Sequence, residues 1–219
     1  MPNIRHKYQT IEFGNVDIHL RTLKDTQQFF DKNDEAQKLG INSASWALFG
    51  VLWPSSQVLA NYILTTDTRS KRILEIGCGI GLSSLLLNHL DKNITATDYH
   101  PEAESYLFQN TQLNGDEKIP FYRLNWEDDQ LKGIGKFDII IGSDLLYEPN
   151  HSTLLSNFIN KYANDKCDVI IVDPNRNNHS KFKQAMLGFG FEYEKIETIK
   201  YTKEPFKGAI HKYNINAIE

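Results

Sequence analysis

Short apolar runs alternate along most of this chain with stretches in which apolar residues recur every three or four positions. The runs at residues 73–76, 139–142 and 169–172 are almost wholly apolar, whereas residues 81–90 and 151–163 have helical spacing. Strands without a polar face are typical of a parallel sheet that helices cover on both sides. The pattern therefore predicts an α/β fold with a doubly wound, mostly parallel sheet.

The same pattern places the individual elements of this core. Helices are predicted at residues 81–90, 101–114, 151–163 and 179–190, and strands at residues 72–79, 93–98, 119–126, 137–144, 167–174, 191–201 and 211–218. Only residues 203–209 connect the last two strands, which is too short for a parallel crossover. We therefore predict that the last strand pair is antiparallel and lies at one edge of the sheet.

Residues 1–70 predict a smaller extension in front of the core at 71–219. Residues 8–13 and 16–23 alternate in hydrophobicity around a Gly-Asn pair, which is a tight-turn signal and predicts a β-hairpin. The polar stretch 25–40 is expected to be helical or irregular. We expect the hairpin and helical extension to lie on the substrate side and to form one structural unit with the core.

Composition adds a modest acidic balance to this picture. The 219 residues have a net charge of −4 and a pI near 6.0, which gives no general attraction to nucleic acid or to an anionic membrane. Between Asp98 and Glu148, however, the sequence has eleven acidic residues and only four basic ones. This stretch is either a solvated acidic face or the mouth of a site that prefers cationic substrates.

The cysteines and the hydropathy indicate a cytoplasmic protein. Cys78 and Cys167 each lie beside strand-like apolar residues, which suits buried thiols better than a disulfide framework or a metal cluster. No apolar run reaches the roughly 18 residues that a membrane span requires. The first 25 residues have no signal-peptide core, and the histidines show no metal-ligand spacing.

A glycine-rich loop follows the first core strand, where a doubly wound sheet binds its ligands. The sequence there places Glu75 two residues ahead of Gly77, Gly79 and Gly81. Glycines let the backbone approach a ligand closely, and the helix that follows directs its amide dipoles to the same place. A dinucleotide fingerprint requires a glycine where this chain has Leu82, so an NAD-dependent oxidoreductase is disfavoured.

Polar and aromatic residues also follow the next two predicted strands. Asp98 ends the second strand and suits hydrogen bonds to both hydroxyls of a ribose; its alternative is to cap the next helix. Tyr99 suits either a purine face or the core. Asn125 offers a donor and an acceptor to an adenine edge, with Trp126 beside it for stacking or for packing.

Taken together, these residues and the acid at the end of the fourth strand resemble the class I, seven-strand S-adenosylmethionine (SAM) methyltransferases. The resemblance implies a Rossmann-like fold, and SAM as cofactor with S-adenosylhomocysteine (SAH) as product. It also implies that the glycine loop binds the methionine part of SAM and that Asp98 binds its ribose. The residues that carry it are Glu75, Gly77, Gly79, Gly81, Asp98, Asn125 and Asp144.

Residues upstream sharpen the resemblance to one subfamily. The chain resembles the small lysine-directed protein methyltransferases in two features. One is Trp53-Pro54 at the first turn of a predicted helix, and the other is the motif Asp144-x-x-Tyr147. The resemblance implies that Trp53 lies against the cofactor, although a core anchor is the alternative. It also counts Ser143 among the cofactor-binding residues.

The resemblance implies that the end of the fourth strand faces the SAM methyl group. An amine must lose a proton before it attacks, because a lysine pKa is near 10.4. Asp144 is expected to attract the ammonium and hold the amine by a hydrogen bond, and Tyr147 to form the pocket wall. Capping for Asp144 and packing for Tyr147 are the alternatives.

The sequence favours a protein lysine as the methyl acceptor, with other classes left open. Leu145-Leu146 replaces the Pro-Pro-aromatic turn of enzymes that methylate planar adenine or glutamine nitrogens. Arginine or a small, nicotinamide-like amine fits nearly as well, and a non-catalytic nucleotide-binding module has no use for Asp144 and Tyr147.

Residues 173–176, Asp-Pro-Asn-Arg, end the fifth predicted strand at the same sheet edge. They are expected to form a turn with Arg176 in solvent, although Asp173 would supply a second acid if the segment lined the cleft. His100 and His179 follow strand ends and are candidates for shedding a proton, with surface or capping positions favoured.

Overall fold

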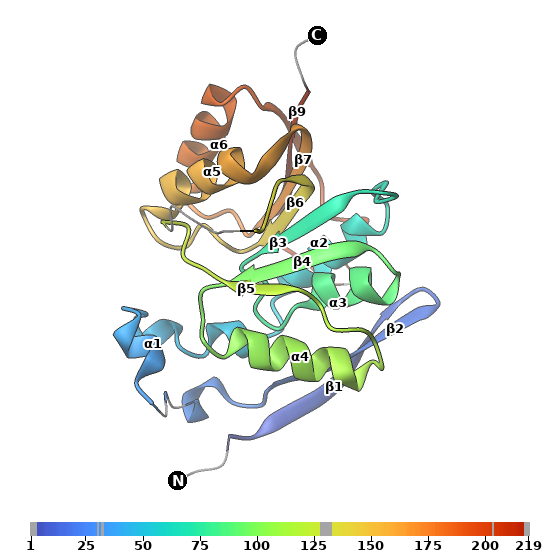
Figure 1. The fold of residues 1–219 in the computed structure, drawn as a ribbon, viewed down its shortest axis with the longest axis vertical. Helices are drawn as coiled ribbons and strands as arrows, with labels where there is room; N and C mark the ends of the chain where they lie inside the picture. Colours follow the sequence, from blue (N-terminus) through green and yellow to red (C-terminus); the bar gives the residue numbers. More distant parts are fainter. Residues whose placement is uncertain (1–3, 30, 32, 128–132, 203, 217–219) are drawn as a thin grey trace.

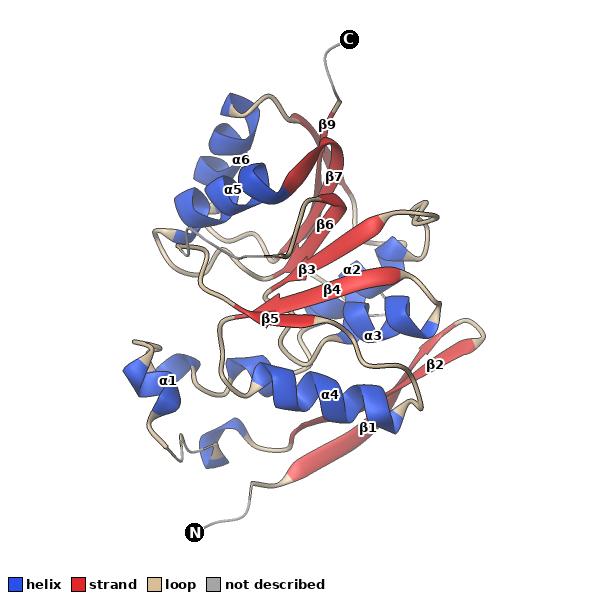
Figure 2. Cartoon of the chain, in the orientation of Figure 1, coloured by secondary structure: helices blue, strands red, loops and turns tan. Residues whose placement is uncertain are grey.

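The computed structural model describes residues 4–29, 31, 33–127, 133–202 and 204–216. Two sheets and six α-helices occur in these residues, with the large sheet between two helical layers (Figures 1 and 2). The strands are β1 (His6–Phe13), β2 (Val16–Leu23), β3 (Arg72–Ile76), β4 (Asn93–Asp98), β5 (Phe121–Arg123), β6 (Phe137–Ser143), β7 (Ala163–Asp173), β8 (Glu192–Ile196) and β9 (Ala209–Ile215). The helices are α1 (Glu35–Lys38), α2 (Pro54–Ile63), α3 (Leu82–His89), α4 (Ala103–Leu113), α5 (His151–Tyr162) and α6 (His179–Gly188), with 3-10 turns at Thr26–Gln28, Ser43–Ser45 and Leu48–Gly50.

The large sheet has the order β5-β4-β3-β6-β7-β9-β8. Strands β3 to β7 pair in parallel, and β9 runs antiparallel to both β7 and β8. The predicted doubly wound sheet with an antiparallel last pair is confirmed. Strand β6 lies directly beside β3, so the end of the Asp144 strand adjoins the glycine loop.

Alternating side chains of the central strands fill two separate cores. On one side, Ile139 and Ile141 pack with the cluster that includes α2, α3, α4 and the hairpin. On the other side, Ile140 packs with Leu155 of α5 and Phe182 of α6. Since successive strand residues point to opposite faces, an unbroken apolar run supplies both cores at once.

The N-terminal hairpin is confirmed, and α4 covers its outer edge. Asn110 accepts from the backbone N of Arg21 (2.7 Å) and donates to its carbonyl (3.3 Å). One turn later, Asn114 makes the same pair of contacts with His19, at 2.8 Å each. Side chains one helical turn apart are spaced like alternate residues of a strand. The two asparagine amides therefore satisfy the backbone hydrogen-bonding groups on the outer edge of β2, where a third strand would otherwise pair.

Several predicted strand boundaries are wrong; the strands predicted at 72–79 and 191–201, for example, end at Ile76 and Ile196. The strand predicted at 119–126 extends only from Phe121 to Arg123, because its sole partner β4 ends at Asp98, opposite Arg123. Asn125 and Trp126 therefore lie in the following loop. Strand β7 begins at Ala163, directly after α5, earlier than predicted. In the last predicted strand, positions 217 and 218 lie outside the described residues.

Among the helices that the structure describes, none combines the length and the apolar character that a bilayer crossing demands.

Candidate active site

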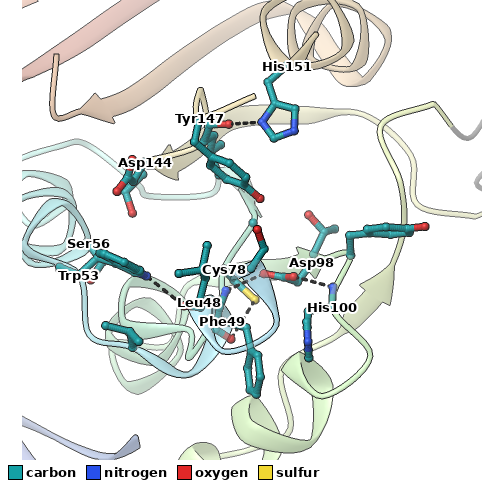
Figure 3. A pocket seen from close by; sticks show the side chains of 18 of the residues that line it. Leu48, Phe49, Trp53, Ser56, Cys78, Asp98, His100, Asp144, Tyr147 and His151 are labelled. Carbon is teal, nitrogen blue, oxygen red and sulfur yellow. Dashed lines mark hydrogen bonds between the residues drawn. The ribbon is translucent and has the colours of Figure 1, made fainter. Parts of the chain in front are cut away.

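A cavity of about 330 Å³ lies at the carboxyl ends of β3, β4 and β6. Ten of the twelve predicted site residues line it: Trp53, Gly77, Gly79, Asp98, Tyr99, Asn125, Trp126, Ser143, Asp144 and Tyr147. Figure 3 shows Tyr147 directed into the space between Asp144 and Asp98. The topology thus brings together side chains from four separate loops, as expected at the switch point of a doubly wound sheet.

The glycine loop forms one wall of the cavity through its backbone. Gly77 and Gly79 have φ angles of +59° and +55°, in the left-handed region that favours glycine. A Cβ on Gly79 would lie 2.9 Å from the carbonyl oxygen of Phe49, which is too close for a side chain. The loop therefore passes tightly between the N-terminal segment and the strand ends.

Asp98 holds this loop in place. Its Oδ2 accepts from the backbone N of Gly79 and its Oδ1 from that of His100, both at 2.8 Å. Burial raises the pKa of Asp98, and these hydrogen bonds oppose the rise. Helix α4 begins at Ala103 with Glu102 at its N-cap, so Asp98 does not cap it. The carboxylate still borders the cavity.

Glu75 and Gly81 do not line the cavity but support the loop from behind. The Glu75 carboxylate accepts from the backbone N of Ser84 (2.9 Å) and from its hydroxyl, in the first turn of α3. Burial is the main reason why the pKa of Glu75 rises to about 7. A Cβ on Gly81 would collide with Leu107 of α4, so this glycine permits close helix packing.

The segment between α1 and α2 forms the opposite wall. Trp53 lines the cavity and also donates from Nε1 to the carbonyl oxygen of Leu48 (3.0 Å). Phe49 stacks on His100 with ring centroids 4.1 Å apart. Burial lowers the pKa of His100 to about 4, which leaves this ring neutral near pH 7. Tyr99 donates to the carbonyl oxygen of Leu39 (2.6 Å) and thereby ties the segment to β4.

At the end of β6, Asp144 adopts a left-handed backbone conformation with φ of +55°. This conformation is uncommon for a residue other than glycine. Helix α5 has Asn150 at its N-cap, so Asp144 does not cap it. The Nε of Arg176 instead donates to Oδ1 of Asp144 at 2.6 Å. Arg176 is exposed, as expected, but it also lines the cavity, which was the alternative considered for residues 173–176.

Tyr147 and two neighbouring rings form an aromatic rim. The ring centroid of His151 lies 4.6 Å from that of Tyr147 and 5.0 Å from that of Trp126, both edge-on. His151 donates from Nδ1 to the carbonyl oxygen of Leu145 (2.7 Å), which fixes its orientation. Burial is the largest cause that raises the pKa of Tyr147 to about 12, so its hydroxyl is neutral near pH 7.

Asp173 lies behind this rim with no solvent exposure. Its Oδ1 accepts from the backbone N of Arg176 at 2.6 Å, and burial raises its pKa to about 6. The turn expected at 173–176 is present, and it serves to bring Arg176 to Asp144. His179 lies away from the cavity and stacks on His211 at 3.5 Å.

The acidic stretch does not form a single face. Asp98 and Asp144 border the cavity, whereas Asp138 lies near the start of β6, at the other end of the strands. Positions 128 and 129 lie outside the described residues. The described part of the chain contains no group of three or more metal-ligating side chains, and both cysteines are free and buried.

A comparison with protein families shows the family to which this chain belongs. A family model described as lysine methyltransferase matches residues 31–188. The chain belongs to the lysine methyltransferase family. The matched residues include the N-terminal wall of the cavity, the glycine loop, Asp98 and Asp144. The family resemblance seen in the sequence is therefore confirmed.

Curated relatives within this family differ in what they methylate. The chain is 32% identical over 152 residues to a histidine protein methyltransferase 1 homolog of Dictyostelium discoideum, covering 66% of this chain and 47% of that protein. It is 27% identical to the electron transfer flavoprotein beta subunit lysine methyltransferase of Mus musculus, covering 72% and 58%. It is 26% identical to the calmodulin-lysine N-methyltransferase of Arabidopsis thaliana, covering 71% and 54%. The chain thus spans about half the length of the curated relatives it matches.

Solved structures share the fold. The magnesium protoporphyrin IX methyltransferase of Synechocystis, with bound SAM, superposes with a TM-score of 0.58 at 19% identity, covering 74% of this chain and 78% of that one. The 16S rRNA N2 G1207 methyltransferase of T. thermophilus superposes with a TM-score of 0.65 at 11% identity, covering 98% and 52%. At these identities the likeness concerns the fold of the methyltransferase core.

Sequence reasoning missed part of the cavity lining. No periodic signal marks residues 41–51, yet five of their side chains line the cavity: Ile41, Ser45, Leu48, Phe49 and Val51. His151 was also missed as a lining residue, and for Arg176 a position in solvent was favoured over one in the cavity lining. For Arg176 a signal existed, because Asp-Pro-Asn-Arg follows a strand whose carboxyl end lies at the ligand edge.

Proposed function

We propose that this protein is a SAM-dependent N-methyltransferase that modifies a lysine side chain of a protein. The observation that carries the proposal is that Asp144 and Tyr147 border the same cavity as the glycine loop and Asp98. A nucleotide-binding module without catalysis would need the glycine loop and Asp98, but it would have no use for Asp144 and Tyr147. The family membership supports the same reaction class.

The cavity residues fit SAM as a cofactor. Gly77 and Gly79 line the cavity without side chains of their own, which lets a polar amino-acid moiety approach the backbone closely. Asp98 places a carboxylate at the second strand end, where ribose hydroxyls are bound in this class of sheet. Tyr99, Asn125 and Trp126 add ring faces and an amide for the adenine. When bound, SAM supplies a methyl group on a cationic sulfur.

The chain itself must orient and desolvate the acceptor amine. Asp144 offers a fixed oxygen to an N–H of the amine, and the Tyr147 ring favours a cationic or partly cationic nitrogen. A neutral hydroxyl with a pKa near 12 makes Tyr147 a hydrogen-bonding wall rather than a base. With SAM held by these residues, the acceptor would lose its ammonium proton to solvent, and its lone pair would then take the methyl group as the S–C bond breaks and SAH leaves.

The acceptor is an exposed protein lysine in this proposal, and arginine or a small amine is the alternative. The arginine alternative is supported by the similarity of the chain to a histone-arginine methyltransferase of Xenopus laevis. We propose no nucleic-acid or membrane partner, given the net charge of −4. A cytoplasmic location is proposed from the free, buried thiols of Cys78 and Cys167.

Two measurements test the proposal. Calorimetric titration should show binding of SAM and SAH but not NAD. Methyl-labelled SAM incubated with the protein and a cell lysate should label protein, at lysine after hydrolysis, and protease treatment of the lysate should abolish the labelled bands. Asp144→Ala should keep SAM binding and lose the labelling. Binding of NAD in preference to SAM, or full labelling by Asp144→Ala, would refute the proposed site.

A further inference from the structure

Arg176 contacts Asp144 in a way that leaves the carboxylate only half engaged. The Nε of Arg176 donates to Oδ1 of Asp144 at 2.6 Å. Among the described residues no hydrogen bond to Oδ2 occurs, and both residues border the cavity. The Asp144 side chain is 12% exposed and that of Arg176 is 39% exposed. An acceptor amine can therefore reach Oδ2 while the guanidinium stays in place.

The turn at residues 173–176 fixes where the guanidinium lies. The backbone N of Arg176 donates to the buried Asp173, and Asn178 donates from its side chain to the carbonyl oxygens of Leu146 and Glu148, at 3.0 Å each. These bonds tie the β7–α6 loop to the β6–α5 loop. The arginine thus approaches Asp144 from a braced backbone rather than from a free surface loop.

Charge explains why this pairing matters for methyl transfer. An isolated carboxylate attracts an ammonium and raises the pKa of that amine, because an opposite charge nearby favours the charged form. The reaction requires the neutral amine, and a carboxylate that binds ammonium too well opposes it. A guanidinium on the other oxygen offsets this attraction while leaving a hydrogen-bond acceptor for the N–H.

We propose that Arg176 is a positioning residue that, by pairing with Asp144, keeps the acceptor amine from being held as an ammonium ion. The inference rests on the proposed function, since it concerns the acceptor end of the same cavity. Of the other titratable groups, Tyr147 and Asp173 interact with this pair directly. Glu148, Asp98 and His151 lie around Tyr147. Three of these five are carboxylic acids, and Arg176 is the only arginine or lysine among the described residues that line the cavity.

A cofactor analogue tests the proposal without a known acceptor. Sinefungin is a SAM analogue in which a carbon bearing an ammonium group replaces the methylated sulfur, and SAH is the neutral counterpart. The ratio of their affinities, measured by calorimetry from pH 6 to pH 10, reports how strongly this end of the cavity attracts an ammonium. The variants are Arg176→Gln, Arg176→Lys, Asp144→Asn and the Arg176→Gln/Asp144→Asn double variant.

We expect Arg176→Gln to raise the preference for sinefungin over SAH at pH 7 by about fivefold, the size of a partly exposed charge pair. The pH at which bound sinefungin loses its proton should rise with it. Arg176→Lys should give an intermediate ratio. In the Asp144→Asn background, Arg176→Gln should change the ratio much less, since the pairing partner is gone.

The matched control is Arg69→Gln, which removes an arginine from an exposed ion pair with Asp67 (2.8 Å), in a loop that does not line the cavity. It should leave the ratio unchanged. An Arg176→Gln protein with the wild-type ratio and pH profile would overturn the inference, as would the same change in both Asp144 backgrounds. Should Arg176→Gln fail to fold, a wild-type ratio in Arg176→Lys together with a raised one in Asp144→Asn would overturn it. A wild type that binds neither SAH nor sinefungin would instead refute the proposed function.

Discussion

The backbone N of Gly79 donates to Oδ2 of Asp98 at 2.8 Å, so the acid at the end of β4 and the glycine loop after β3 form one unit. The other carboxylate oxygen accepts from His100. Asp98 therefore shapes the wall of the cavity as well as bordering it. We therefore expect substitutions of Asp98 to disturb both the glycine loop and the cavity.

Asp98→Asn should weaken both the loop and cofactor binding. An amide has one acceptor oxygen, and its NH₂ group must then face a backbone N–H. We expect a loss of about 1–3 kcal/mol in the free energy of unfolding, with SAM affinity reduced at least tenfold. Asp138→Asn is the control, because Asp138 also accepts a backbone N–H, that of Arg72 at 2.8 Å, outside the cavity. It should lower stability without affecting SAM affinity; equal loss of affinity in both variants would contradict this role.

Gly79→Ala should impair SAM binding more than its backbone strain explains. A Cβ at this position meets the carbonyl oxygen of Phe49 at 2.9 Å. Gly115→Ala is the matched control: its φ is +72°, and a Cβ there has no neighbour within 4 Å. Both variants should lose about 1–2 kcal/mol of stability from the left-handed conformation. Only Gly79→Ala should lose SAM affinity, as titration calorimetry can establish.

Glu75 should make the protein less stable as the pH rises. Its pKa is about 7 in the folded chain against an ordinary 4.5, so between these values the folded state binds more protons than the unfolded state. The stabilising contribution is present below pH 4.5 and is lost as the pH rises toward 7, by about 3 kcal/mol. Glu75→Gln removes this term. Urea unfolding from pH 4 to pH 8 should show the variant gaining stability relative to wild type. Glu117→Gln, at an exposed loop position, provides the baseline; parallel curves for wild type and Glu75→Gln would disprove the prediction.

Tyr147 should act through its ring rather than its hydroxyl. With a pKa near 12 the hydroxyl is not a base at working pH, so Tyr147→Phe should keep methyl transfer within about threefold. Tyr147→Ala removes the ring that packs on His151 and should lower the rate about tenfold or more. Tyr8→Ala removes a tyrosine that is 64% exposed on the hairpin and should have no effect. A large loss in Tyr147→Phe would assign the chemistry to the hydroxyl instead.

Elements whose pattern is local were predictable from the sequence. The apolar run 139–142 predicts a buried parallel strand because burial on both faces leaves no polar position, and β6 confirms it. Pro54 predicts a helix start because its missing N–H costs nothing there, and α2 begins at that residue. The position of the glycine loop and Asp98 at one edge of the sheet was also predictable, because the carboxyl ends of parallel strands share that edge.

Contacts between irregular segments were not predictable in this way. Residues 41–51 close the cavity through 3-10 turns and loops whose apolar side chains follow no period. The pairing of Asn110 and Asn114 with the hairpin depends on how α4 lies against β2. Local hydrophobicity carries no information on either arrangement.

The sequence alone determined a doubly wound sheet, its ligand edge, and an acid and a tyrosine at the end of the fourth core strand. These depend on side-chain periodicity and on backbone freedom, which act over a few residues. Only the tertiary structure decided that Arg176 pairs with Asp144, thirty-two positions earlier, and that Glu75 supports the loop instead of lining the cavity. Such contacts depend on the long-range packing of loops, where each side chain's partner is set by the whole fold.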